Sequence, residues 1–411
     1  MRVYLRTFGC RANQYDSEAV RAMIEASGSE IVSTPDEADA AVFNSCAVTA
    51  AAEADLRQSV RRAARRRPEL KTVVMGCASA RDNGTIAALP TVESVVAGAD
   101  LLGVAAALGL PPSVRQPNVQ TGTRGLLRIQ DGCDEHCTFC ATTLARGAAR
   151  SRSADDLVEE SMRLADRHPE IVITGIHIGH YGVETNTTLS VLMDRLVRDV
   201  PNVRFRLSSL EATEVDDRLR ELFAEPLRLA PHLHAPLQSG SDRVLKRMGR
   251  HWYTASSYAA AVEGVVRDTR VFALGADVIA GFPGETDDDH ATTRALIESL
   301  PFTYLHVFPY SVRPGTAAER LGGHVHAAEI ERRAQELRVL SNRSAQAHRA
   351  SRLGTECDLV VIGSDGHREG LTEDYLTVAV SPSLPRGTRC PARLDGDPAR
   401  LLGVPLQPII P

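Results

Sequence analysis

The first hundred residues alternate between short apolar runs and longer stretches in which apolar residues recur at helical spacing. Runs of this length predict strands, and the amphipathic stretches predict helices. We expect strands at 3–8, 31–33, 40–44, 72–75 and 92–97, and helices at 16–27 and 50–67. Asp16 or Ser17 is a suitable cap for the first helix. Strands that alternate with helices in this way predict a parallel, doubly wound sheet.

Residues 101–123 interrupt the alternation. Pro111, Pro112 and Pro117 cluster in this segment. Because proline interrupts helices and strands, we expect a linker here. We therefore assign residues 1–110 to a first domain.

The alternation resumes with a longer period from residue 124 to about residue 325. The expected strands are 126–129, 171–174, 203–207, 232–237, 276–279 and 304–308. The expected helices are 154–166, 189–200, 215–223, 258–268 and 287–300. About six βα units predict a partial parallel barrel with its active site at the carboxyl ends of the strands. A long polar helix expected at 327–353 would bridge to the next domain, so the second domain is 124–350.

Short strands replace this pattern from Gly354 onward. We expect them at 357–362, 370–380 and 388–394. Several short strands so close together predict a small antiparallel barrel of the oligonucleotide-binding type. Residues 354–411 form the third expected domain, and the whole chain falls in the α/β class.

Composition limits the function without naming it. The 411-residue chain is 43% hydrophobic and 24% charged, as in ordinary globular proteins, and has no apolar run near the roughly 18 residues of a membrane span. Its amino end shows no signal peptide, so we expect a cytoplasmic protein without a membrane partner. The net charge of −5 argues against nucleic-acid binding through bulk charge, although a local basic patch would suffice. Arg61 and Arg65 share a helical stripe that either contacts phosphate or is a solvated helix face.

Three cysteines close together in sequence carry the most specific chemical signal. These loop cysteines, Cys133, Cys137 and Cys140, follow the expected strand 126–129 with the spacing Cys-x3-Cys-x2-Cys. A closed zinc site needs a fourth ligand, and His136 lies between two cysteines, where a short loop would have difficulty turning it onto the same ion. Three thiolates suit a cubane iron–sulfur cluster with one open iron. Zinc and a buried group of thiols remain the alternatives.

Three further cysteines follow the carboxyl ends of different strands in the first domain. Because such ends meet along one edge of a parallel sheet, we expect these strand-end cysteines, Cys10, Cys46 and Cys77, to converge. No fourth cysteine accompanies them, so the pattern predicts a second cluster with an open iron. The alternative is that they are small buried side chains without a ligand. Cys357 and Cys390 have no partner motif, and we expect them to be inert.

The loop cysteines, with an aromatic residue before the last of them, resemble the radical S-adenosylmethionine (SAM) superfamily. The segments that resemble the amino-terminal domain of methylthiotransferases are 8–18, 44–49 and 75–77, and the segment that resembles their RNA-binding TRAM domain is 369–378. The resemblance covers essentially the whole chain. It implies two [4Fe-4S] clusters and SAM as cofactors. In the family, the loop cluster binds SAM and releases a 5′-deoxyadenosyl radical, and the other cluster is the platform for sulfur and methyl transfer.

Polar or glycine-containing clusters follow the other expected barrel strands and look like the SAM-cradling segments of the family. These clusters are 174–179, 208–211, 238–241, 281–285 and 310–316. The residues at the matching positions are Thr174, Gly175, Ser209, Glu211 and Gln238. His232 and His234 alternate along one expected strand and so face the same side. We interpret them as barrel-lining, because no orienting partner is apparent.

Within the family, the chain is most similar to the branch that acts on N6-threonylcarbamoyladenosine (t6A) at position 37 of tRNA. The similar segments are 13–18, 130–133 and 145–147. Ala141–Leu144 departs from that branch, which carries an isoleucine–proline pair there. The implied reaction replaces the hydrogen at adenine C2 with a methylthio group, with one SAM as methyl donor and a second as radical source.

The resemblance also implies partners and leaves alternatives. The implied partners are the anticodon loop of tRNA, an electron-donating reductase and a sulfur source. Tyr375 would either stack on a base or belong to the core. Alternative activities are methylthiolation of isopentenyladenosine in tRNA or of an aspartate in a ribosomal protein. A non-catalytic RNA-binding iron–sulfur protein is the alternative from another class.

Overall fold

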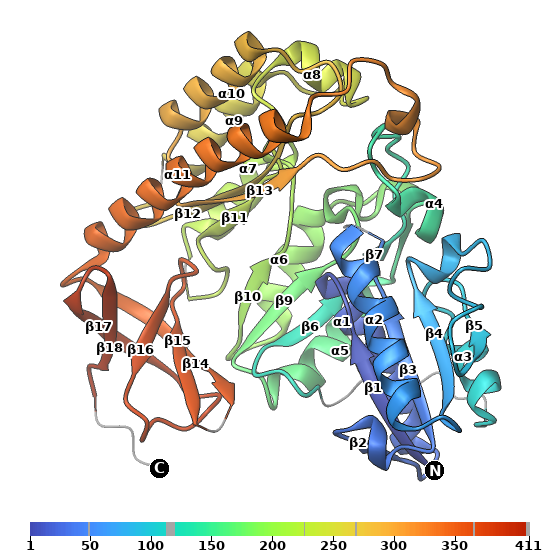
Figure 1. Cartoon of the computed structure of the whole chain (residues 1–411). Helices are drawn as coiled ribbons and strands as arrows, with labels where there is room; N and C mark the ends of the chain where they lie inside the picture. Colours follow the sequence, from blue (N-terminus) through green and yellow to red (C-terminus); the bar gives the residue numbers. More distant parts are fainter. Residues whose placement is uncertain (48–49, 112–119, 226, 268, 365, 408–411) are drawn as a thin grey trace.

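The computed structural model describes residues 1–47, 50–111, 120–225, 227–267, 269–364 and 366–407, and the statements below concern these residues. The chain forms three parts in order: a parallel sheet with helices on both faces, a partial barrel of βα units, and a small closed β-barrel (Figure 1). The mixed α/β class and the closed barrel at the carboxyl end confirm the predicted fold class.

The first part is a five-stranded parallel sheet in the order β2-β1-β3-β4-β5. Its strands are β1 (Arg2–Thr7), β2 (Glu30–Val32), β3 (Ala40–Ser45), β4 (Lys71–Gly76) and β5 (Val92–Val95). Helices α1 (Arg11–Ala26) and α3 (Leu101–Leu108) share an apolar core on one face of the sheet. Helix α2 (Ala50–Arg66) covers the other face over a separate core. The sheet is therefore doubly wound, as the alternation predicts.

Helix α1 begins at Arg11, so the prediction that Asp16 or Ser17 caps it is wrong. Cys10 occupies the N-cap position. The first turns bury polar side chains beside Ala12 and Tyr15: Asn13 and Asp16 are almost fully buried. Apolar spacing did not mark this start, because the inner face of these turns is partly polar.

The expected linker at 101–123 is wrong for its first third, which forms helix α3. The Asp100 side chain caps this helix by accepting a hydrogen bond from Gly103 N at 2.9 Å. Gly109 ends it in the left-handed region, with a φ of 68°. The helix packs against α1 and β4. Two of the three prolines lie outside the described residues.

The second part contains the six predicted strands, all parallel within their sheets. They are β6 (Gly125–Arg128), β9 (Glu170–Thr174), β10 (Arg204–Leu207), β11 (His232–His234), β12 (Ala273–Ala280) and β13 (Tyr304–Pro309). They form two three-stranded sheets, β10-β9-β6 and β11-β12-β13. Single bridges, Phe205 with Leu229 and Ser209 with His234, join the two sheets into a partial barrel. The helices are α5 (Ala154–Ala165), α6 (Leu189–Asp199), α7 (Asp217–Phe223), α8 (Asp242–Arg247), α9 (Ala255–Val266) and α10 (Asp287–Ser299).

Helix α11 (Ala327–Arg352) connects the partial barrel to the closed barrel, as the expected bridge does, and it also packs on the barrel core. It runs along the outside of the barrel and leads into the closed barrel (Figure 1). Ala334 and Leu337 pack into the barrel core, and Ser341 Oγ accepts a hydrogen bond from Leu305 N of β13 at 2.8 Å. No helix in the described ranges has the length and apolar character needed to cross a membrane.

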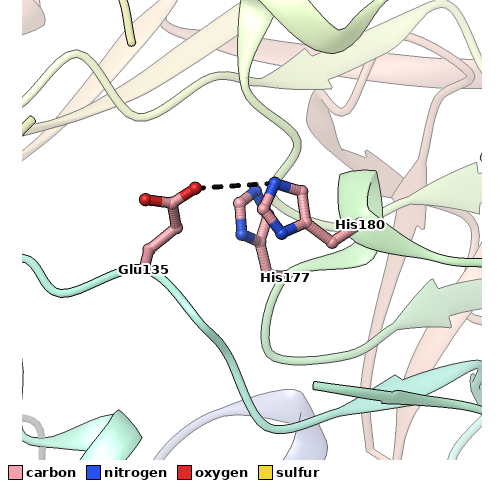
Figure 2. A group of neighbouring side chains, drawn as sticks. All are labelled: Glu135, His177 and His180. Atoms are coloured by element: carbon pink, nitrogen blue, oxygen red, sulfur yellow. Dashed lines mark ion pairs between the residues drawn. The ribbon is translucent and has the colours of Figure 1, made fainter. Parts of the chain in front are cut away.

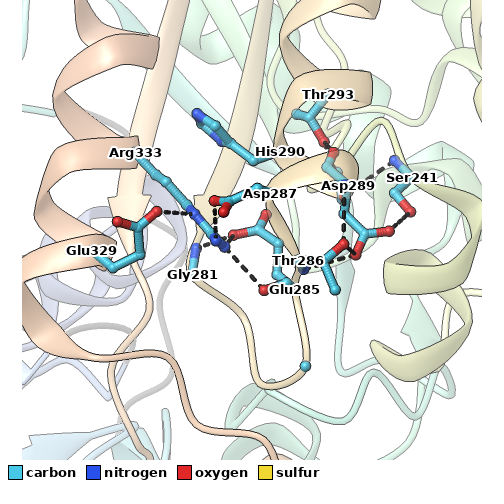
Figure 3. Close-up of polar contacts among 12 residues, drawn as sticks. Ser241, Gly281, Glu285, Thr286, Asp287, Asp289, His290, Thr293, Glu329 and Arg333 are labelled. Atoms are coloured by element: carbon cyan, nitrogen blue, oxygen red, sulfur yellow. Dashed lines mark hydrogen bonds and ion pairs between the residues drawn. The ribbon is translucent and has the colours of Figure 1, made fainter.

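Ion pairs add to the apolar contacts of this helix. Arg333 of α11 points at the loop that follows β12 (Figure 3). Its Nη1 binds Glu285 Oε2 at 2.9 Å, and the same oxygen accepts a hydrogen bond from Gly281 N at 2.7 Å. Beyond this loop, Asp289 accepts a hydrogen bond from Ser241 Oγ at 2.6 Å. The segment 281–285 is thus fixed from outside the barrel by α11.

The third part is a closed barrel of five strands in the order β14-β15-β16-β18-β17. Its strands are β14 (Glu356–Ser364), β15 (His367–Leu371), β16 (Thr377–Val380), β17 (Arg389–Asp397) and β18 (Arg400–Pro405). The single strand expected at 370–380 is wrong. Two strands occupy this region, and the turn between them holds Tyr375 with a φ of 68°. Apolar spacing did not reveal β18.

A buried ion cluster ties the partial barrel to the closed barrel. Glu170 is fully buried and accepts hydrogen bonds from Arg204 Nε at 2.7 Å and Arg206 Nε at 2.8 Å. Arg204 Nη1 also binds Asp358 Oδ2 of β14 at 2.8 Å, and Arg206 Nη2 donates to the Thr372 carbonyl at 3.0 Å. Burial would raise the pKa of Glu170, but the charges of Arg206 and Arg204 outweigh it and hold the pKa well below its usual value.

Candidate active site

The strand-end cysteines come together at the carboxyl edge of the first sheet. They directly follow or lie close behind β1, β3 and β4, and the strand order reverses between β1 and β3, where ligands of such sheets bind. The Sγ atoms of Cys10 and Cys77 lie 3.6 and 3.8 Å from one atom, Asn13 Oδ1. Cys46 lines the same cavity. Three thiols far apart in sequence thus share one site.

Arg146 adds positive charge to this site from the second part of the chain. Its Nε lies 3.3 Å from Cys77 Sγ, and its Nη2 binds Asn13 Oδ1 at 2.9 Å and Asp16 Oδ2 at 2.7 Å. Burial raises the pKa of Cys77 to about 11, although Arg146 opposes this. Such a thiol ionises at neutral pH only when a cation binds it. The three thiols beside a guanidinium therefore fit an iron–sulfur cluster.

The loop cysteines lie between β7 (Gln130–Asp131) and α4 (Thr142–Arg146). Cys140 N donates to the Cys137 carbonyl at 3.0 Å, which closes a turn between the two cysteines. Arg250 Nη1 lies 3.5 Å from Cys137 Sγ. Burial raises the pKa of Cys137 to about 12 in spite of Arg250. Each group of three thiols is therefore matched with one buried arginine.

Gly132→Ala is expected to reduce iron loading at the loop cysteines. Gly132 has a φ of 75°, and a methyl group there would collide with the backbone of Ala148. The next residue, Cys133, donates its N–H to the Gly147 carbonyl at 3.0 Å, so the loop would have to shift. We expect the variant to retain about half of the wild-type iron, because only the strand-end site would still fill.

Iron per chain after anaerobic reconstitution measures this effect. Gly366→Ala is a matched control, because Gly366 has a φ of 90° but open space where the methyl group would lie. Wild-type iron content in both variants would contradict the prediction.

A pair of stacked histidines, His177 and His180 (Figure 2), lies next to one of the loop cysteines, Cys133. The ring centroids of His177 and His180 are 3.8 Å apart. His177 Nδ1 lies 3.7 Å from Cys133 Sγ, and its Nε2 lies 2.8 Å from Glu214 Oε1. Glu135 Oε1 lies 3.6 Å from His180 Nε2. Burial lowers the pKa of His177, but the contacts with Cys133 and Glu214 outweigh it and raise the pKa to about 10.

A cavity of about 460 Å³ lies where the three parts of the chain meet. Its lining includes the strand-end cysteines and three of the predicted SAM-binding residues, Thr174, Gly175 and Ser209. The other two lie elsewhere. Glu211 binds Arg250, which contacts Cys137, and accepts a hydrogen bond from Trp252 Nε1 at 2.6 Å, so it lies near the loop cysteines. Gln238 is buried, with a φ of 62°. The volume suits a ligand of nucleoside size.

His232 and His234 line this cavity, but the expectation that they lack an orienting partner is wrong. Tyr304 Oη lies 2.8 Å from His232 Nε2 and 3.1 Å from His234 Nδ1. His234 Nε2 lies 3.0 Å from Asp277 Oδ1. Sequence reasoning missed Asp277 and Tyr304, although both fall in or next to expected strands at positions that can face inward.

The three residues predicted to bind RNA have different surroundings. Tyr375 reaches the cavity from the closed barrel, and its ring centroid lies 4.4 Å from that of His232. Arg61 and Arg65 are exposed on α2. They belong to the outer surface of the first part and do not line the cavity.

Comparisons with known proteins agree with this layout. The family model described as "Uncharacterized protein family UPF0004" matches residues 2–98, and that of the "Radical SAM superfamily" matches residues 127–297. The threonylcarbamoyladenosine tRNA methylthiotransferase MtaB of Aquifex aeolicus is 32% identical over 92% of this chain and 96% of its own. Its counterpart in Bacillus subtilis is 34% identical over 92% of this chain and 89% of its own. The chain belongs to the radical SAM methylthiotransferase family.

Membership of this family makes the protein an enzyme whose cofactors are SAM and [4Fe-4S] clusters. Solved structures support the fold of the methylthiotransferase chain. The radical SAM methyltransferase TsrM of Kitasatospora setae has a TM-score of 0.60 at 14% identity, covering 77% of this chain and 75% of its own. The cobalamin-dependent radical SAM enzyme OxsB has a TM-score of 0.52 at 11% identity, covering 83% of this chain and 57% of its own.

Proposed function

We propose that this methylthiotransferase acts on t6A at position 37 of tRNA and replaces the hydrogen at C2 of the adenine with a methylthio group. The observation that carries the proposal is that the strand-end cysteines and the ends of the barrel strands line the same cavity. The relatives from Aquifex aeolicus and Bacillus subtilis, which are named for t6A in tRNA, support the choice of nucleoside.

Two [4Fe-4S] clusters are part of the proposal. The loop cysteines would hold one and the strand-end cysteines the other, each with one iron lacking a protein thiolate. When bound, the clusters and SAM supply a radical that removes an unactivated hydrogen, and the sulfur and methyl group that replace it. Arg146 and Arg250 offset the negative charge of thiolates that burial would otherwise keep protonated.

The titratable side chains of the cavity orient the substrate in this proposal. No group next to C2 of adenine makes its hydrogen acidic, so His234 or Tyr304 could not remove it as a proton. Asp277 fixes the ring of His234, and Tyr304 links that ring to His232. These contacts hold the wall of the cavity in one arrangement, as a binding site for a base requires.

The partners and the division into domains complete the proposal. We assign residues 1–110 to the strand-end cluster domain, 124–350 to the radical SAM barrel, and 354–411 to an RNA-binding domain of TRAM type. The closed barrel supports the last assignment, because Tyr375 extends from it into the cavity. Arg61 and Arg65 would contact tRNA phosphates. A cytoplasmic reductase would deliver electrons, and a separate sulfur source would replenish the transferred atom.

Mass spectrometry of tRNA nucleosides from cells that lack the gene tests this proposal. We expect loss of the methylthio form of t6A and accumulation of t6A, with rescue by the intact gene. Loss of methylthio-isopentenyladenosine instead would move the activity to that nucleoside. An unchanged nucleoside profile, in a strain without a second enzyme of this kind, would exclude a tRNA substrate and direct attention to ribosomal proteins.

A further inference from the structure

Arg11 places a positive charge in the cavity without a carboxylate to balance it. This residue follows Cys10 directly, and both line the cavity. Its Nη2 donates to Tyr375 Oη at 2.9 Å, and it forms no ion pair with any described residue. The side chain is partly buried.

Three buried arginines near the active site form ion pairs with carboxylates, unlike the partly buried Arg11. Arg146 binds Asp16, Arg206 binds Glu170, and Arg250 binds Glu211. Proteins pair buried charges because an unpaired one is costly. An arginine that lines a ligand cavity and has no internal partner is thus available to an anionic group of the ligand.

A second unpaired group lies on the same wall. Asp277 is ionised, because His234 and His306 hold its pKa well below the usual value despite burial, so His234 Nε2 must be the donor in their contact. Tyr304 Oη lies within hydrogen-bond distance of both His234 Nδ1 and His232 Nε2.

The other ring nitrogen of His232, Nδ1, is buried and has no partner among the described residues. Burial lowers the pKa of His232 well below its usual value, which keeps the ring neutral. Tyr375 connects the two groups, since it contacts Arg11 through its hydroxyl and stacks on His232. The wall thus presents an unpartnered ring nitrogen and a cation side by side.

We propose that Arg11 binds a carboxylate of the substrate in this cavity and so selects a nucleoside that carries an acidic side chain. The inference rests on the proposed function, in which that group is the threonyl carboxylate of t6A. The neighbouring His232 Nδ1, which has no partner among the described residues, is free to hydrogen-bond the urea that links threonine to adenine. C2 of adenine and C6, which carries the N6 substituent, are both bonded to the ring nitrogen N1. A side chain held by Arg11, next to Cys10, therefore leaves C2 close to the strand-end cysteines.

A double-mutant cycle tests this inference through binding alone. The reconstituted enzyme, without reductant, is titrated into a fluorescent anticodon stem–loop that carries t6A, its threonine amide, or unmodified adenosine. We expect the wild type to prefer the acid over the amide by roughly ten- to a hundredfold, as for a hydrogen bond between charged groups. Arg11→Gln should bind the t6A loop and the amide loop with equal affinity, close to the affinity of the wild type for the amide loop. Arg11→Lys should keep part of the preference.

Arg21→Gln is the matched control. Arg21 lies on the same helix but pairs with Glu18 and Glu25, and it should leave the preference unchanged. Iron content after reconstitution checks that each variant is folded and loaded. An acid preference that survives Arg11→Gln overturns the inference. The inference is also overturned if Arg11→Gln weakens binding of the acid and the amide loop equally and makes the affinity less dependent on salt. That result would assign Arg11 to a backbone phosphate. A wild type that binds the unmodified loop as tightly as the t6A loop overturns the proposed substrate together with the inference.

Discussion

Cys133→Ala is expected to abolish SAM cleavage by the reduced enzyme, lowering it by more than about a hundredfold. Two thiolates cannot replace three in holding a cubane cluster, and loss of a group outside the ligand shell alone costs about 10- to 100-fold. Formation of 5′-deoxyadenosine, measured by liquid chromatography, reports this step without tRNA. Continued SAM cleavage by the variant would contradict the assignment of the loop cysteines.

Cys77→Ala distinguishes the roles of the two proposed clusters in the same assay. The strand-end site lies on a different sheet, so we expect SAM cleavage to 5′-deoxyadenosine to persist while transfer of the methylthio group to tRNA is lost. Iron content should fall to roughly half. Cys390→Ala in β17 serves as the control and should change neither activity nor iron. Loss of SAM cleavage in Cys77→Ala would contradict the proposed division of labour.

Glu170→Gln is expected to destabilise the protein by about 3–5 kcal/mol, because it leaves two buried arginines without their shared counter-charge. Arg204 and Arg206 also hold the closed barrel, through Asp358 and Thr372, so the loss should affect both parts. Chemical denaturation measures the change in the free energy of unfolding. Glu159→Gln, which removes an exposed partner of Arg163, should cost at most about 1 kcal/mol. If both substitutions lowered the free energy of unfolding by at most about 1 kcal/mol, the buried ion cluster would contribute little to stability.

The contribution of Glu170 should depend on pH in a defined direction. Its pKa in the folded protein lies well below that of an unfolded glutamate, which is about 4.3. The stabilisation is therefore complete above the unfolded pKa and declines as the pH falls towards the folded pKa. The difference in stability between wild type and Glu170→Gln should be constant above about pH 5 and narrow below about pH 4. A difference that grows as the pH falls would contradict this account.

Much of the fold follows from apolar periodicity, and the exceptions have physical causes. The strands of both parallel parts were predictable because each contains a short run of apolar residues, even where charged residues such as Arg204 and Arg206 are buried among them. The start of α1 was not, because Asn13 and Asp16 fill its inner face and find partners in distant segments. The packing of α11 could not be predicted for a similar reason, because a polar residue, Arg333, contacts the neighbouring loop through an ion pair with Glu285.

The sequence predicted the site only where residue type and position at the end of an expected strand identify a residue. The cysteines could be grouped because each group has a recognisable position relative to strands. Contacts between side chains of different parts left no local signal: Arg146 reaches Cys77, and Arg11 reaches Tyr375, which lies 364 residues away in the chain. Such pairs require the assembled structure.

The position of Tyr375 in the cavity wall sets an order of events during protein synthesis. All six cysteines that would hold clusters lie within the first 140 residues, whereas His232, Tyr304 and Tyr375 follow much later. Because a chain leaves the ribosome amino end first, the thiols are exposed to the cell before the residues that enclose them exist. Iron–sulfur donors would therefore have open access to the strand-end cysteines on the nascent chain, and Tyr375 would complete the cavity wall only after the closed barrel is made.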